Sequence, residues 1–304
     1  MVALTTAPGS ACAATPKAGP ATHPATGPAT DPATKPATRQ TVGQKTRALH
    51  EAWRDRLAAE RFNALEAGPF LIAGNGTPAQ LAAYRDGTIL AAEASLRAMY
   101  FGNPLEEPVL ILLFETEGPY KRLAKKWFDE TDVPHFGFYR PWDRCMLMNV
   151  GTGTGTLVHE LVHALIAPDF PEVPDWFNEG LASLYEQSQI AQDRRSITGL
   201  VNWRLPALQK AIKEGTLRPI AEMAADDDFR NAERTGINYA HARYLMLYLQ
   251  EKGLLRKYYA AFKAGHKADP TGIETLKKVI GEDQPFDRWE REWKAWVMTL
   301  GAGR

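Results

Sequence analysis

The sequence is poor in cysteine, carries no net charge and has no long apolar run. Each of these absences excludes a class of protein or of binding partner. Its 304 residues include two cysteines, Cys12 and Cys145, which fall in a predicted tail and a predicted strand, so we expect no disulfide between them. Lys+Arg and Asp+Glu both number 36, which gives no general affinity for nucleic acid or an anionic membrane surface. No stretch approaches the ~20 apolar residues of a transmembrane helix.

The first 40 residues lack the side chains that build a core. Residues 20–39 repeat the pattern P-A-T-x, and proline at every fourth position is incompatible with helix and with strand pairing. We therefore predict a disordered Pro/Ala/Thr-rich tail over residues 1–40. Residues 11–13, Ala-Cys-Ala, have the small-x-small pattern of a signal cleavage site, but no basic start or apolar run precedes them. The compartment therefore stays open between extracytoplasmic (periplasmic, secreted or surface-tethered) and cytoplasmic.

Residues 41–304 have the composition of a globular domain, with 44% hydrophobic residues in the whole chain. In the first half, periodicity predicts helices over residues 46–66, 77–100 and 120–128, and strands over residues 70–73, 108–114, 135–139 and 144–150. After residue 185, it predicts helices over residues 206–213, 239–252, 254–264, 272–280 and 286–300. This order predicts an α+β fold in which a small mixed-sheet lobe (residues 41–155) is followed by a mainly helical lobe (residues 156–304).

One stretch, residues 151–163, carries a chemical signature: it reads GTGTGTLVHELVH and ends in H-E-x-x-H. On a helix, His159 and His163 lie one turn apart on the same face and can direct two imidazoles at one metal ion. Glu160, beside the first histidine, can reach a water molecule at that metal. Two nitrogen ligands, an open position and a neighbouring base are what a catalytic zinc ion requires.

A third ligand is available downstream. Residues 175–186 read DWFNEGLASLYE and predict a second helix that contains Glu179, 16 residues after His163. That separation allows one connecting loop and a return, so a helix hairpin can bring the Glu179 carboxylate to the two imidazoles. The alternative is a helix pair with ordinary, satisfied polar groups. The spacing favours a His₂Glu site for zinc, Zn²⁺, with one position left open.

These motifs resemble those of the gluzincins, zinc metallopeptidases with H-E-x-x-H and a glutamate on the next helix. Residues 176–182, WFNEGLA, are similar to the W-L-N-E-G-F-A segment of the M1 aminopeptidase family. Residues 137–141, GFYRP, match the G-F-Y-x-P stretch of the uncharacterised bacterial peptidase MA-like families. The resemblance implies a zincin-like fold with its active site between the two lobes. No G-x-M-E-N segment, which holds a free amine in the M1 family, precedes the zinc helix, so an M1-type aminopeptidase is not expected.

The resemblance also implies roles for individual residues. Glu160 would be the general base of a zinc-dependent peptidase, and a peptide or protein would be the substrate. Tyr239, 60 residues after Glu179, would donate a hydrogen bond to the oxyanion, although a packed aromatic at a helix start explains it equally well. His241 would face elsewhere on that helix. Ser183 stands where related enzymes often carry an acidic partner for a zinc histidine, and this departure would weaken the orientation of the ligands.

Two further segments allow alternatives. Residues 146–150 are either the edge strand that pairs with an extended substrate or an ordinary strand. Residues 151–156 lack the G-K-[ST] ending of a phosphate-binding loop, which favours a flexible lead into the zinc helix. The function classes that remain are a zinc peptidase and a non-catalytic zincin-fold binding or scaffold domain. An intact Glu160 favours the peptidase, and the sequence leaves the oligomeric state open.

Overall fold

The computed structural model of the chain describes residues 40–281 and 283–301. Except for Gln40, the predicted tail over residues 1–40 lies outside this described part. From Gln40 onward the chain forms one compact unit of mixed α and β structure, and the predicted α+β class is confirmed at this level. Within the described residues, no helix combines the length and apolarity needed to cross a bilayer.

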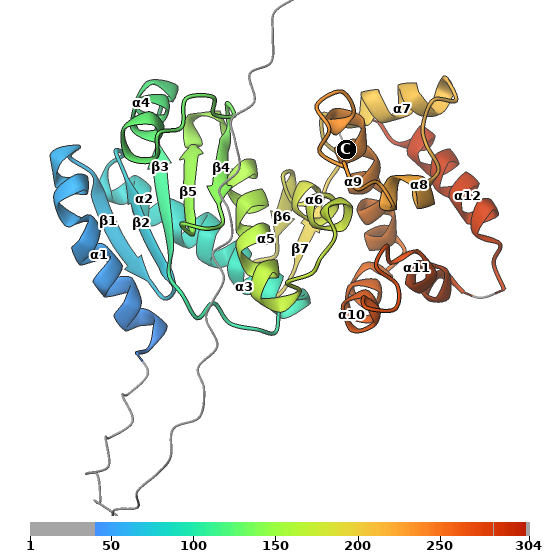
Figure 1. The fold of residues 1–304 in the computed structure, drawn as a ribbon, viewed down its shortest axis with the longest axis horizontal. Coiled ribbons are helices and arrows are strands. Elements are labelled where there is room, and N and C mark those ends of the chain that lie inside the picture. The colour runs from blue at the N-terminus through green and yellow to red at the C-terminus, as the bar shows by residue number, and fades with distance from the viewer. Residues whose placement is uncertain (1–39, 282, 302–304) are drawn as a thin grey trace, which may run out of the picture. The chain divides into compact units, whose positions relative to one another are not determined.

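The first half of the described chain builds the main sheet (Figure 1). Its elements are α1 (Val42–Ala59), β1 (Asn63–Ala67), β2 (Phe70–Gly74), α2 (Pro78–Tyr84), the π-helical turn η1 (Arg85–Ile89), α3 (Leu90–Met99), β3 (Val109–Phe114), α4 (Glu117–Phe128), β4 (Gly137–Arg140) and β5 (Cys145–Asn149). The strands are ordered β1-β2-β3-β5-β4, with parallel pairing of β2, β3 and β5 and antiparallel pairing of β1 and β4 at the two edges.

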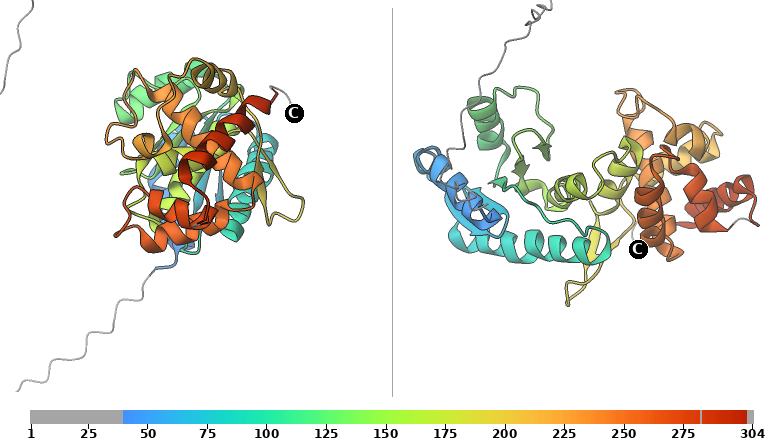
Figure 2. Two further views of the ribbon diagram at one scale, coloured as in Figure 1. Left: turned by 90° about the vertical axis from the view of Figure 1, so that its right-hand side faces the viewer. Right: turned by 60° about the horizontal axis from the view of Figure 1, so that its bottom comes forward.

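Helices cover both faces of this sheet because its central strands are apolar on both sides. Along β2, Phe70 and Ile72 pack into the core shared with α2, α3 and the helices that follow, whereas Leu71 and Ala73 pack into a second core with α1 and α4. Continuous apolar runs are expected of strands that are buried on both faces. In the right-hand view of Figure 2, α1 and α4 lie on one side of the sheet and the α2–α3 helices on the other.

The second half is mainly helical. Its elements are the 3-10 turn η2 (Val150–Thr152), α5 (Gly155–Asp169), α6 (Asp175–Leu184), β6 (Ser188–Ile190), β7 (Ile197–Gly199), α7 (Leu205–Lys213), α8 (Ile220–Ala224), α9 (Thr235–Glu251), α10 (Leu255–Gly265), α11 (Ile273–Ile280) and α12 (Phe286–Thr299). Helix α9 is buried on nearly all sides, since α6, α7, α8, α10 and α12 all contact it. The left-hand view of Figure 2 looks onto these helices.

The structure corrects one expectation, decides between two alternatives and adds a hairpin. The predicted helix over residues 46–66 ends at Ala59, and β1 occupies Asn63–Ala67, because pairing with β2 outweighs the local helix preference of the segment N-A-L-E-A. Of the two alternatives for residues 146–150, the structure supports the ordinary strand: β5 lies between β3 and β4, so β4 is the edge. The short β6–β7 hairpin was not predicted, since each of its strands has only three residues.

Candidate metal centre

Helix α5 presents the two histidines. Its apolar residues Leu157, Leu161 and Leu165 recur every four positions and are fully buried, which fixes the rotation of the helix against the core. His159 and His163 consequently share the adjacent face. Pro168 lies in the last turn, and the helix ends one residue later at Asp169.

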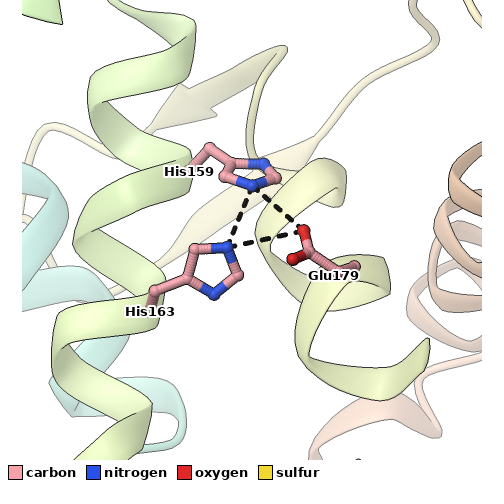
Figure 3. Close-up of side chains that lie close together, drawn as sticks. All are labelled: His159, His163 and Glu179. Atoms are coloured by element: carbon pink, nitrogen blue, oxygen red, sulfur yellow. Dashed lines mark hydrogen bonds and ion pairs between the residues drawn. The ribbon is translucent and has the colours of Figure 1, made fainter. Parts of the chain in front are cut away.

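Helix α6 presents the carboxylate. It starts after Pro174, and its aromatic residues Trp176 and Phe177 are buried against the C-terminal helices. Packing of α6 against α5 turns Glu179 toward the two imidazoles, as Figure 3 shows. The three predicted ligands, which are separated by up to 20 positions in the sequence, therefore lie together and are largely buried.

The three donor atoms converge on one point. His159 Nε2 lies 3.0 Å from His163 Nε2, and Glu179 Oε2 lies 3.2 Å and 3.5 Å from these two nitrogens. Ligands about 2.0–2.1 Å from a tetrahedral ion lie about 3.3 Å from one another. Glu179 Oε2 is buried and has no hydrogen-bond partner within the described part of the chain. The donor set and its spacing therefore fit a metal ion.

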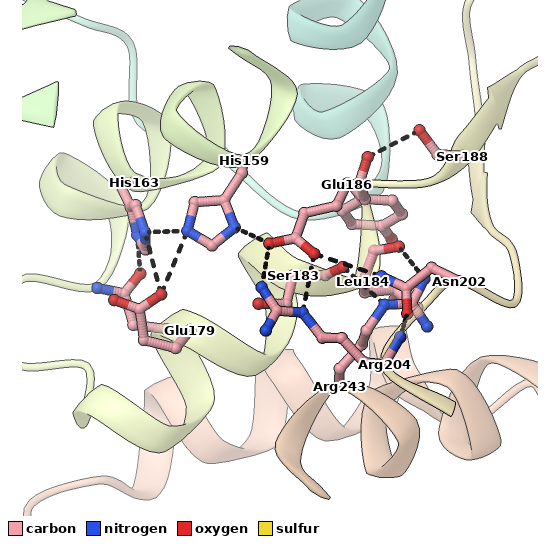
Figure 4. A network of polar contacts seen from close by, with 12 residues as sticks. His159, His163, Glu179, Ser183, Leu184, Glu186, Ser188, Asn202, Arg204 and Arg243 are labelled. Atoms are coloured by element: carbon pink, nitrogen blue, oxygen red, sulfur yellow. Dashed lines mark hydrogen bonds and ion pairs between the residues drawn. The ribbon is translucent and has the colours of Figure 1, made fainter. Parts of the chain in front are cut away.

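Each histidine has a polar partner on its outer nitrogen. His163 Nδ1 lies 2.8 Å from Asn178 Oδ1, and His159 Nδ1 lies 3.2 Å from Glu186 Oε1 (Figure 4). Neither partner was predicted from the sequence, in which Ser183 occupies the position where related enzymes often carry an acid. Asn178 precedes the third ligand directly, so its position in N-E-G was a usable signal. Glu186 follows the end of α6, and its role depends on the path of the chain beyond that helix.

Burial and charged neighbours shift the pKa values of His159 and Glu179. Burial alone would lower the pKa of His159, but its contacts with Glu179 and Glu186 outweigh burial and raise that pKa to about 10. Burial would raise the pKa of Glu179, and the two imidazoles hold it well below its usual range. Two imidazoles therefore stand among three carboxylates, the third being Glu160. Arg230 pairs with Glu179 and Arg204 with Glu186, and these guanidinium groups balance part of the negative charge.

The second carboxylate oxygen of Glu179, Oε1, pairs with an arginine. Arg230 Nη2 lies 2.8 Å from Glu179 Oε1 and 3.1 Å from Asp175 Oδ1. One carboxylate oxygen is thus occupied by a guanidinium, while the other faces the imidazoles. This arrangement favours Glu179 as a ligand through a single oxygen.

Glu160 and the three predicted ligands line a cleft of about 980 Å³. Tyr139 of the edge strand β4 and Trp142, which follows that strand, also line it. Glu160 is only 9% exposed, and burial raises the pKa of its carboxyl. A carboxylate with a raised pKa beside an open metal position is suited to exchange a proton with water.

Tyr239, the predicted oxyanion donor, also lines the cleft. Its ring is parallel to that of His159, with centroids 6.5 Å apart. Burial and the neighbouring Glu179 carboxylate raise the pKa of its hydroxyl, which therefore stays protonated and able to donate. His241 is buried against Trp293, with ring centroids 5.0 Å apart, and does not line the cleft.

In the lead into α5, for which a flexible segment is predicted, residues 151–153 are exposed, but two glycines lie against other backbone segments. A Cβ on Gly151 would come within 2.4 Å of the Glu115 carbonyl oxygen, and one on Gly155 within 2.2 Å of the Glu186 carbonyl oxygen. Both glycines are therefore required by the close approach of another backbone. Gly155 lies one turn before His159, and its lack of a side chain allows the Glu186 backbone to pack against the start of α5.

Compared with known protein families, the chain matches none, and no similar sequence is found among curated proteins.

Proposed function

We propose that this protein is a zinc-dependent peptidase of the gluzincin type, with a zincin-like arrangement of its sheet and helices. The observation that carries the proposal is the convergence of His159, His163 and Glu179 beside Glu160, on the wall of an open cleft. Nitrogen and carboxylate ligands in this ratio suit zinc, and the open side of the group leaves room for a water molecule and a substrate.

Zinc bound by this group would act as a Lewis acid that activates water and polarises the peptide carbonyl. Glu160 would accept the proton of the attacking water and pass it to the leaving amine. The protonated hydroxyl of Tyr239 would donate to the oxygen of the carbonyl as negative charge develops there. Arg230 would keep Glu179 turned toward the imidazoles during these steps.

The cleft supports a polymeric substrate. The edge strand β4 carries Phe138 and Tyr139 along one side of the cleft and has no neighbour in the sheet beyond it within the described chain. An extended peptide could add to this edge through backbone hydrogen bonds. Ala164 and Ala167, on the continuation of the metal-ligand face, also line the cleft. Their small side chains leave space beside His163.

The decisive experiment compares the wild type with Glu160→Gln in zinc content and in cleavage of an unstructured protein such as casein. Gln has nearly the same size as Glu but cannot accept the proton, so we expect full zinc content and a loss of hydrolysis by several orders of magnitude. Glu130→Gln, at a partly exposed carboxylate that pairs with Arg140, is the control. Equal inactivity of wild type and variant on casein and on peptide libraries would favour a zincin-fold binding or scaffold domain.

A further inference from the structure

We propose that Glu186, clamped by Arg204, is the residue that positions His159 for metal binding and replaces the acid expected at Ser183. The inference rests on the proposed metal site and names a positioning pair that the motif does not contain. The network connects His159 on α5, Glu186 just after α6 and Arg204 just before α7 (Figure 4).

The contacts of Glu186 are directional. Its Oε1 lies 3.2 Å from His159 Nδ1 and accepts a hydrogen bond of 2.9 Å from Arg204 Nη2. Its Oε2 accepts hydrogen bonds from Arg204 Nε at 3.1 Å and from Asn202 Nδ2 at 3.3 Å. The side chain of Glu186 is only 7% exposed. Two-point binding by a guanidinium restricts both the position and the plane of this carboxylate.

Carboxylate oxygens lie 3.2 Å from both ring nitrogens of His159, Glu179 Oε2 from Nε2 and Glu186 Oε1 from Nδ1. With a metal ion between Nε2 and Glu179, the Glu186 carboxylate would hold the ring proton on Nδ1 and leave the lone pair of Nε2 for the metal. Nε2 is the atom that faces His163 and Glu179. The ion-pair contact with Glu186 also restrains rotation of the ring. Glu186 therefore supplies both the tautomer and the ring orientation that a ligand requires.

Ser183 does not fill this role. Its hydroxyl is buried without a hydrogen-bond partner among the described residues, and its carbonyl oxygen accepts a hydrogen bond from Arg243. Gly155 provides the room that Glu186 needs, since any side chain there would meet the Glu186 carbonyl oxygen at 2.2 Å. Glu186, which follows the end of α6, therefore takes the place of the acid that is missing at position 183. Its backbone packs against Gly155 in the first turn of α5.

Arg204 has a second contact in the site. Its Cζ lies 5.2 Å from the centroid of the Tyr239 ring, a favourable distance for a cation–π interaction. The guanidinium thus packs on the ring of the proposed oxyanion donor and also holds the partner of a metal ligand. A change at Arg204 should therefore disturb both groups, whereas a change at Glu186 should act mainly on His159.

The test measures metal affinity and does not depend on peptidase activity. Zinc affinity of the full chain is determined by competition with a chromogenic chelator for wild type, Glu186→Gln, Arg204→Met and Gly155→Ala. We expect Glu186→Gln to bind zinc about 10–100-fold more weakly, the usual cost of losing such a partner, and the other two variants to weaken binding as well. The visible absorption of cobalt-loaded protein should shift in Glu186→Gln, because the basicity of one ligand changes.

Two matched controls separate positioning from general damage. Glu60→Gln removes a carboxylate held in the same two-point way, by Arg122, on α1's C-terminal side. Gly118→Ala adds a methyl group on α4 where no atom lies within 4 Å. Both should keep the wild-type zinc affinity and cobalt spectrum.

The outcomes are distinct. Wild-type affinity and spectrum in Glu186→Gln would overturn the positioning role and leave the proposed peptidase intact. Failure of the wild type itself to bind zinc would overturn both proposals. If circular dichroism shows that Glu186→Gln does not fold, Arg204→Met and Gly155→Ala decide the question, and unchanged zinc affinity in both overturns the inference.

Discussion

Gly180 lies directly against Ala242: a Cβ on the glycine would come within 3.0 Å of the Ala242 Cβ and 3.2 Å of its carbonyl carbon and oxygen. Gly180 follows the predicted ligand Glu179 on α6, and Ala242 is on α9, three residues after Tyr239. The absence of a side chain at position 180 allows the two helices to approach closely. The glycine of the N-E-G motif therefore brings a predicted ligand and the predicted oxyanion donor to the same cleft.

Adding a methyl group at this contact should separate the helices. We expect Gly180→Ala to lower the free energy of unfolding by about 1–3 kcal/mol, the usual cost of overpacking a core, and to weaken zinc binding. Ala242→Gly removes one of the clashing atoms. Denaturant unfolding of the two single variants and the double variant forms a cycle. Additive effects in that cycle would show that the contact is not strained by the added methyl group.

Removing a ligand should remove the metal. We expect wild type to bind one zinc ion per chain and His163→Ala to lose stoichiometric zinc, since only two of the three ligands remain. His135→Ala, which truncates an exposed histidine beside Glu117, is the control and should keep its zinc. Metal analysis after dialysis provides the measurement, and circular dichroism checks the fold. Full zinc occupancy in His163→Ala would disprove the ligand assignment.

Tyr239→Phe should affect the reaction more than the metal. An oxyanion donor acts mainly in the transition state, so we expect kcat to fall by about 10²–10³, with little change in KM or zinc content. Tyr248→Phe is the control on the same helix, because the Tyr248 ring packs between Trp289 and Trp296. Steady-state kinetics on one peptide substrate are sufficient. A Tyr239→Phe variant within about threefold of wild type would assign the role to another group.

His241 should make stability depend on pH. Burial, with smaller effects from Lys294 and Arg218, lowers its pKa from 6.5 to about 3. In the unfolded chain the same group binds a proton first as the pH falls. The stability that depends on neutral His241 is therefore fully present above pH 6.5 and is lost as the pH falls from 6.5 toward 3.

The measurement is denaturant unfolding at about pH 7 and pH 5. Each pH unit below 6.5 should cost up to about 1.4 kcal/mol through this one group. His241→Phe keeps a ring to stack on Trp293 but cannot titrate, so its free energy of unfolding should fall less over this interval. Identical pH slopes in wild type and variant would rule out His241 as the source.

Much of the fold follows from local patterns. The C-terminal helices α10 and α11 have apolar periodicity and clear stops, so their bounds agree with the predictions to within one residue. The segment N-A-L-E-A in β1 is different: its composition favours a helix, and only pairing with β2 makes it a strand. The same is true of the sheet edge, because the order of strands is set by contacts between distant segments.

In the candidate site, too, some residues follow from local sequence and others only from the tertiary structure. Helix geometry alone places His159 and His163 on one face, and one loop plus a return is enough to bring Glu179 to them, so local sequence was sufficient for the predicted ligand set. Glu186 and Arg204 could not be found in this way. They lie beyond the end of α6 and are brought to His159 by the β6–β7 hairpin and by close packing on Gly155. A side chain that positions a metal ligand can come from any segment that the fold places beside that ligand. The path of the backbone decides which segment this is, and only the tertiary structure shows that path.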